Sequence, residues 1–258
     1  MSFEDIAYVI GEKVEILGTK ILEILRNVLF PTPTHTLPKF RVTSRLVRGD
    51  LTVHEFLSLH IQICFVVYLA VNFILIVIKG IPLYLLAISI PYFLYLRYFF
   101  IRYGNFLIEE KPYKLFYYGI SALSFLAFLG YSLIRFFSPK IYYHCAYIGM
   151  TVLTVFLFRH YFKTTFGRAY TYGIVEEVKG ELALVSVHDD IRANVKPGKY
   201  WVESAEEVEV GDIVKVLVEE RILRGSIPKR VLEVHKVRPS SSETSTEPKA
   251  ESERSTSK

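Results

Sequence analysis

The first candidates for a functional role are polar side chains that lie within long apolar segments. Asn72 stands within an apolar segment around residues 57–78, and Arg97 about one turn inside the next, around 81–101. An amide or a charge is costly to bury in a bilayer, so such residues often serve binding or transport. The alternative for Asn72 is a hydrogen bond between helices, and for Arg97 a side chain that reaches the headgroups.

Acidic residues are missing from these apolar segments, which argues against a proton or cation transporter. Motifs of common active sites are missing as well: the sequence has no GxGxxG, GxxxxGK[ST], GxSxG or HExxH. The seven histidines lack the short spacing to another His or to a Cys pair that a zinc site needs. We therefore expect no enzymatic activity, no metal and no cofactor.

A second group of candidate residues lies in the region 169–238, where aromatic and basic side chains could form a binding surface: Tyr172, Tyr200, Trp201, Arg221, Arg224 and Arg230. Aromatic rings with a basic groove are typical of single-stranded nucleic-acid binding. However, this region holds 11 Lys/Arg against 13 Asp/Glu, a net charge of −2, which argues against nucleic acid. Anionic lipid, an acidic protein, or simply a solvated pair of strands remain as interpretations of the basic residues.

The elements that must position these residues follow from the hydrophobic pattern. A membrane-spanning helix needs about 20 apolar residues, and segments of that length occur around 57–78, 81–101, 115–136 and 141–162. Lipid offers no hydrogen bonds to the backbone, so these segments are predicted to be helices. The short separations within the first and second pair predict two hairpins.

The distribution of Lys and Arg around the spans predicts their orientation, because cytoplasmic loops carry an excess of basic residues. One side receives three, Lys79, Arg135 and Lys140, and the other eleven: Lys39, Arg41, Arg45, Arg48, Arg97, Arg102, Lys111, Lys114, Arg159, Lys163 and Arg168. We expect a multi-pass protein of the cell membrane, in contact with lipids and with both termini in the cytoplasm.

After Gly167 the pattern changes to the period of two that is typical of strands. Strands are predicted around 171–178, 181–188, 199–203, 213–220 and 230–237, separated by turn signals such as Lys179-Gly180 and Gly211-Asp212. Five short strands in about 70 residues suit a small closed barrel of the OB or SH3-like type. The sequence therefore predicts an α+β membrane protein, with a barrel following four transmembrane helices.

The remaining segments complete the domain organisation. Residues 1–30 are predicted to form an amphipathic helix, whose apolar residues, Val14 and Leu17 among them, recur with heptad spacing. Such a helix could mediate a homo-oligomer, lie on the membrane surface, or pack within the protein. Residues 31–54 are a proline-containing basic linker, 55–168 the transmembrane domain, 169–238 the barrel, and 239–258 a disordered tail without large apolar residues.

Three motifs after the hairpins carry a family resemblance: Tyr172-Gly173-Ile174-Val175, Pro197-Gly198-Lys199-Tyr200 and Gly211-Asp212-Ile213-Val214-Lys215-Val216. With the paired hairpins, over roughly residues 40–237, the chain resembles an uncharacterised archaeal family of multi-pass membrane proteins, catalogued as a domain of unknown function. The last two motifs are also similar to the cytoplasmic OB barrel of NfeD-type membrane proteins, which scaffold partners. The N-terminal heptads and the missing protease-like segment depart from the NfeD type.

The leading hypothesis is a membrane-anchored scaffold that presents its barrel to a protein partner at the cytoplasmic face. The alternative is a small transporter or channel with the barrel as a regulatory domain, which rests on Asn72, Pro91 and Arg97. A third hypothesis, membrane-tethered nucleic-acid binding, rests on the basic residues of 221–238.

Overall fold

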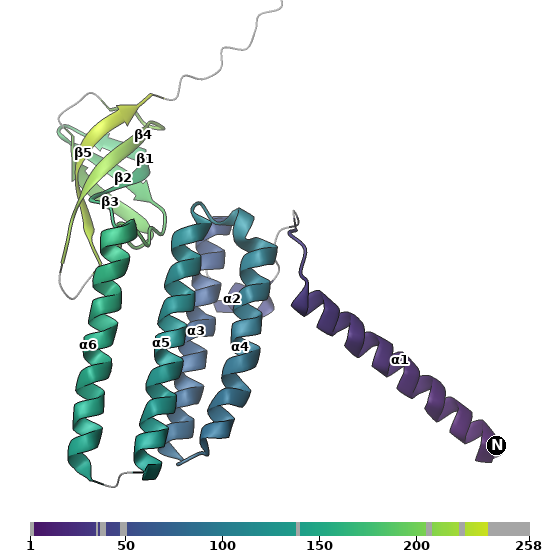
Figure 1. Ribbon diagram of the computed structural model, residues 1–258. Coiled ribbons are helices and arrows are strands. Elements are labelled where there is room, and N and C mark those ends of the chain that lie inside the picture. Colours follow the sequence, from purple (N-terminus) through teal and green to yellow (C-terminus); the bar gives the residue numbers. More distant parts are fainter. Residues whose placement is uncertain are drawn as a thin grey trace, which may run out of the picture.

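The computed structural model describes residues 3–34, 36, 40–46, 51–137, 140–204, 208–221 and 225–236. These residues form a bundle of four long helices, a closed five-stranded barrel at one end of it, and an N-terminal helix that leaves the side of the bundle obliquely (Figure 1). The predicted fold class, an α+β membrane protein, is confirmed. The predicted disordered tail, 239–258, lies outside the described residues.

The bundle consists of α3 (Val53–Val77), α4 (Pro82–Tyr103), α5 (Glu110–Phe137) and α6 (Ile141–Phe166), and a short 3-10 helix η1 (Gly104–Phe106) follows α4. All four long helices are long and apolar enough to cross a membrane, and each overlaps one of the predicted spans. At the start of α3, Thr52 and Glu55 form a capping box, in which each side chain accepts a hydrogen bond from the other residue's backbone amide.

The apolar core of the bundle lies at the barrel end, where Leu57 and Ile61 of α3 pack with Phe99 and Phe100 of α4. Farther from the barrel, pairs of hydroxyl groups connect α3 to α4 and α4 to α5. The hydroxyls of Tyr68 and Ser89 lie 3.0 Å apart, and those of Tyr92 and Ser121 lie 3.1 Å apart. Because lipid provides no alternative partners, these bonds help to hold α3, α4 and α5 together.

The contact between α5 and α6 depends on two glycines of α5, eleven residues apart and therefore on one face of the helix. A Cβ added to Gly119 would lie 2.4 Å from a ring carbon of Phe158, and one added to Gly130 would lie 2.1 Å from the hydroxyl of Tyr147. Small residues of this kind let membrane helices approach closely. Along α6, whose residues are all described, Phe162 alone is buried.

The barrel comprises β1 (Tyr170–Lys179), β2 (Leu182–Val187), β3 (Gly198–Glu203), β4 (Ile213–Glu219) and β5 (Ile227–His235). The strand order is β1-β2-β3-β5-β4, with β3 and β5 parallel and the other pairs antiparallel. This Greek-key order favours the OB type over the SH3-like type. Alternate residues point inward and are mostly valines, including Val175, Val185, Val202, Val214 and Val216.

The structure explains why glycine is required at two positions of the sequence motifs, Gly173 and Gly211. A Cβ at Gly173 would lie 2.3 Å from Cγ1 of Val185 and 2.7 Å from the carbonyl oxygen of Ser186, so β1 and β2 approach only without a side chain there. Gly211 has a φ of +96°, a conformation that L side chains rarely adopt, in the turn before β4.

The first two helices differ in how well the sequence predicted them. The predicted N-terminal helix is confirmed as α1 (Phe3–Leu29). Helix α2 (Arg41–Leu46) was not predicted, because residues 31–54 read as a linker. Its Thr43 is fully buried, and the Thr43 hydroxyl lies 2.6 Å from Nδ1 of His60 on α3. Part of the expected linker therefore packs against the bundle.

Candidate functional site

The most elaborate polar arrangement lies where the bundle meets the barrel. Only Gly167, Arg168 and Ala169 separate α6 from β1. Gly167 caps α6 by donating its amide to the carbonyl of Lys163 at 2.8 Å, and an added Cβ would lie 2.3 Å from that carbonyl oxygen. This tight connection places Arg168 between the two domains.

Asp190, in the loop between β2 and β3, is the centre of the arrangement and is buried. Its Oδ1 accepts the amides of Arg192 and Ala193 at 3.0 and 3.1 Å, which shapes its own loop. Its Oδ2 accepts a bond from Nη2 of Arg168 and one from the hydroxyl of Thr171, both at 2.8 Å. A buried carboxylate with this many donors is well compensated for its lost hydration.

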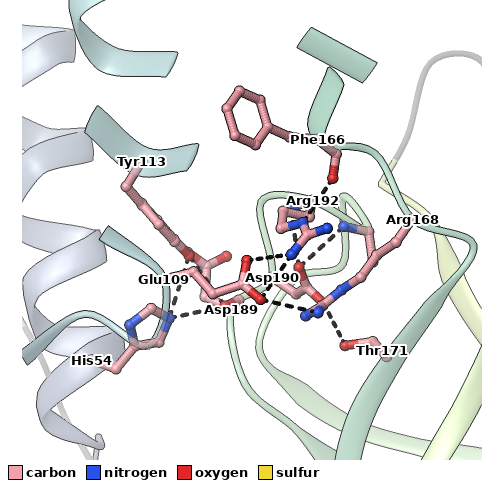
Figure 2. Close-up of polar contacts among 10 residues, drawn as sticks. His54, Glu109, Tyr113, Phe166, Arg168, Thr171, Asp189, Asp190 and Arg192 are labelled. Atoms are coloured by element: carbon pink, nitrogen blue, oxygen red, sulfur yellow. Dashed lines mark hydrogen bonds and ion pairs between the residues drawn. The ribbon is translucent and has the colours of Figure 1, made fainter. Parts of the chain in front are cut away.

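Glu109, in the loop between η1 and α5, extends the cluster to the bundle (Figure 2). Its carboxylate lies 3.1 Å from Nη1 of Arg168 and 2.9 Å from Nη1 of Arg192, whose Nε donates to the carbonyl of Phe166 at 2.7 Å. Two carboxylates thus balance two guanidiniums. Burial opposes the charge of Arg168, but the hydrogen bond and charge of Asp190, and then the charge of Glu109, outweigh it and raise the pKa of Arg168.

Asp189 makes a second connection, to α3 and α5. Its backbone carbonyl accepts bonds from Nε2 of His54 at 3.0 Å and from the hydroxyl of Tyr113 at 3.2 Å. Its side chain accepts bonds from Tyr113, at 3.0 Å, and from the hydroxyl of Ser58. Since Nδ1 of His54 accepts the amide of Ile108 at 3.3 Å, the bonds fit a neutral imidazole with its proton on Nε2.

We call these contacts the junction: the side chains of His54, Ser58, Glu109, Tyr113, Arg168, Asp189, Asp190 and Arg192. The cavity beside them is about 90 Å³, well below the roughly 300–1,000 Å³ of usual ligand sites. The guanidiniums of Arg168 and Arg192 pair with Glu109 and Asp190, whereas the Asp189 carboxylate accepts bonds from hydroxyl groups. The arrangement is therefore suited to holding two domains together.

Sequence analysis did not identify the junction. Asp189-Asp190 falls between the predicted strands 181–188 and 199–203, and Glu109 falls between the predicted spans 81–101 and 115–136, so neither belongs to a motif. One feature of the sequence could have indicated the junction. Glu109 is an acid in the connection between two predicted spans, on the side of the membrane that receives most of the Lys and Arg residues.

The structure distributes the candidate surface residues over three parts of the barrel. Tyr172 of β1 and Arg230 of β5 share one outer face, because β4 pairs with both strands between them. Trp201 of β3 lies on a different face, with Nζ of Lys179 5.0 Å from its ring centroid. Tyr200 and Arg221 line a cavity near the end of α6. Arg224 lies outside the described residues.

The two intramembrane candidates differ in environment. Arg97 is on the exposed surface of α4, as is Pro91, which fits a side chain that reaches the headgroups. Asn72 is fully buried and donates its amide to the carbonyl of Tyr68 at 2.8 Å, within its own helix. Its Oδ1 is buried and has no hydrogen-bond partner among the described residues.

Four membrane-length helices followed by a closed barrel define a multi-pass membrane protein with a small extramembrane domain. The chain belongs to the family described as "Predicted membrane protein (DUF2101)", whose model matches residues 25–232. That match begins in α1 and ends in β5, so it includes bundle, junction and barrel. Searches of curated proteins and of solved structures each found no match.

Proposed function

We propose that this protein is a non-enzymatic membrane scaffold, whose barrel binds a protein partner on the cytoplasmic side. The observation that carries the proposal is the junction. A three-residue connection and the ion pairs of Arg168 with Asp190 and Glu109 hold the barrel against the bundle. A barrel attached in this way presents its remaining surface in a defined orientation, as a scaffold requires.

The surface that fits a protein partner is the outer face of β1, β4 and β5. Tyr172, Ile174, Ile213 and Leu217 are each between 37% and 44% exposed, and the strand register places Ile174 opposite Ile213. We call these four residues the β1–β4 face. Aromatic and aliphatic side chains are typical of the centre of protein interfaces. Lys215 lies among these four residues, opposite Tyr172, and its charge is paired with Glu233 at 2.8 Å.

A pull-down in detergent tests this face in the full-length protein. Ile174→Asp with Leu217→Asp should abolish recovery of the partner that the wild type recovers. The matched control, Val178→Asp with Leu182→Asp, makes the same change at two exposed positions near the β1–β2 turn, and should keep it. Equal recovery with both double variants would refute the β1–β4 face. Deleting the barrel is a poorer test, since Glu109 would lose Arg192 and Arg168 would lose Asp190.

The cytoplasmic orientation rests on the excess of Lys and Arg at the barrel end. An impermeant maleimide applied to intact cells should label Lys79→Cys, between α3 and α4, but not Lys229→Cys on β5. Both substitutions belong in a Cys145→Ser background, because Cys145 is exposed near the start of α6, at the same end of the bundle as Lys79. Labelling of Lys229→Cys alone would reverse the proposed orientation.

A transport function is the second candidate, and Asn72 is the observation that favours it. An unpaired buried amide oxygen is costly in a membrane and is characteristic of functional positions. Liposomes with the wild type should then show a solute flux that Asn72→Leu abolishes and Arg97→Ala preserves. Equal flux in wild-type and Asn72→Leu liposomes would remove this candidate.

A further inference from the structure

A cavity of about 890 Å³ lies between the barrel ends of α5 and α6 and two barrel loops, which join β2 to β3 and β4 to β5. It is about thirty times the volume that one water molecule occupies in the liquid, roughly 30 Å³. It is also within the usual range of ligand sites, roughly 300–1,000 Å³. We call it the α6–barrel cavity.

Its walls are strongly basic. The described part of the lining includes five basic residues and a single acid, Glu220. The basic residues are Arg159 and Lys163 from α6, Arg192 and Lys196 from the β2–β3 loop, and Arg221, which follows β4. Lys163 and Glu220 pair at 2.6 Å, but both side chains are 58% exposed, so this pair is weak and easily exchanged. Arg192 is held by Glu109 in the junction.

Lys196 and Arg221 stand out among these cations. No carboxylate of the described residues lies within ion-pair distance of either side chain. They come from different loops and line the same cavity, together with Tyr200. Two basic side chains without an acidic partner on one wall favour an anionic ligand.

The membrane bundle also contributes aromatic side chains to the lining. Phe116 of α5 and Phe162 of α6 line the cavity, with ring centroids 5.3 Å apart in an edge-to-face contact. Both residues stand in helices that are long and apolar enough to cross a membrane. The cavity therefore combines aromatic side chains of the bundle with cations from both α6 and the barrel loops.

We propose that the α6–barrel cavity binds the headgroup of an anionic phospholipid. Lys196 and Arg221 hold the phosphate, and the first part of the acyl chains lies against Phe116 and Phe162. A bound headgroup adds a contact between α6 and the barrel beside the junction, whose Arg192 lines the same cavity. This site is separate from the β1–β4 face and does not depend on a protein partner.

Lipid binding to the full-length protein in a neutral detergent tests the proposal by native mass spectrometry and calorimetry. The probes are phosphatidylglycerol, phosphatidylcholine, glycerol phosphate and inorganic phosphate. Phosphatidylglycerol should bind at least about tenfold more tightly than the other three, because it alone combines a net negative charge with acyl chains. Equal binding of phosphatidylcholine, or of inorganic phosphate, would overturn the lipid site; the latter result would indicate a site for soluble anions.

Charge reversal locates the site. Lys196→Glu with Arg221→Glu should weaken phosphatidylglycerol binding by about tenfold or more, since two charge-assisted contacts become repulsive. The matched control, Lys179→Glu with Lys236→Glu, makes the same charge change at the far end of the barrel, where both lysines already pair with acids, and should bind like the wild type. Equal affinity in both double variants would overturn the proposal. An unchanged far-UV circular dichroism spectrum verifies that each variant is folded; Trp201 fluorescence is unsuitable here, because Lys179 lies over the Trp201 ring.

Discussion

Asp190 shows how one carboxylate can serve two purposes. Its Oδ1 accepts two amides of its own loop, while its Oδ2 accepts bonds from Arg168 and Thr171. The loop is thus folded by the same side chain that fixes the barrel to the connection from α6. The side chains of Asp190 and Arg168 are only 8% and 14% exposed, so removing one partner leaves the other charged and poorly hydrated.

Asp190→Ala should therefore lower the free energy of unfolding of the barrel by about 3 kcal/mol. This is the lower end of the cost of breaking a buried pair, because Glu109 still balances part of the charge of Arg168. Urea unfolding in detergent, followed by the fluorescence of Trp201, measures it, since Trp201 is the only tryptophan in the chain.

The control is Glu177→Ala, which removes a carboxylate paired with Lys179, where both side chains are largely exposed. It should cost less than about 1 kcal/mol. Adding Arg168→Leu to Asp190→Ala should restore part of the lost stability, because no unpaired guanidinium then remains. Similar costs for Asp190→Ala and Glu177→Ala would contradict the role given to Asp190.

Among the four membrane-length helices, α6 has the fewest buried residues. Phe162 is its one buried residue, and its close contacts with α5 occur at Gly119 and Gly130. Side-chain packing rather than a hydrophobic driving force holds membrane helices together, so these two close approaches should account for much of the α5–α6 contact.

Gly119→Leu should separate α6 from α5, because even a Cβ at this position would lie 2.4 Å from the ring of Phe158. Hydrogen exchange in nanodiscs should then show faster exchange of the α6 amides. Gly149→Leu is the control, since a Cβ on Gly149 of α6 has no atom within 4 Å. Unchanged protection of α6 in Gly119→Leu would mean that other contacts hold this helix.

Periodic elements could be predicted from the sequence, whereas contacts between distant elements could not. The four spans and five strands follow from apolar runs and from alternation, which are local patterns. The pairing of Glu109 with Arg192 joins residues 83 positions apart, and nothing in either local pattern indicates it. Helix α2 was missed for a related reason: six residues after a proline-rich segment carry little periodicity, and the burial of Thr43 involves His60.

For the whole molecule, α1 raises the question of self-association. Val14 and Leu17, both in the predicted heptads, are 63% and 59% exposed, and α1 leaves the bundle obliquely (Figure 1). An apolar face of this kind is stabilised either by a second copy of the helix or by the membrane surface.

If α1 mediates a homo-oligomer, Leu17→Glu should abolish the crosslinked species that the wild type forms in membranes, because a charge would enter the apolar contact. Glu15→Lys, at an exposed polar position of the same helix, should leave crosslinking unchanged. Oligomers that persist in Leu17→Glu would exclude this helix as the contact.

The position of the junction along the chain has a consequence for biosynthesis. Glu109 precedes the second hairpin, but both arginines that bind it, Arg168 and Arg192, follow the last span. During translation both hairpins are therefore synthesised before either arginine. The final alignment of the hairpins must therefore wait for the C-terminal segment, so that a domain outside the lipid completes the assembly inside it.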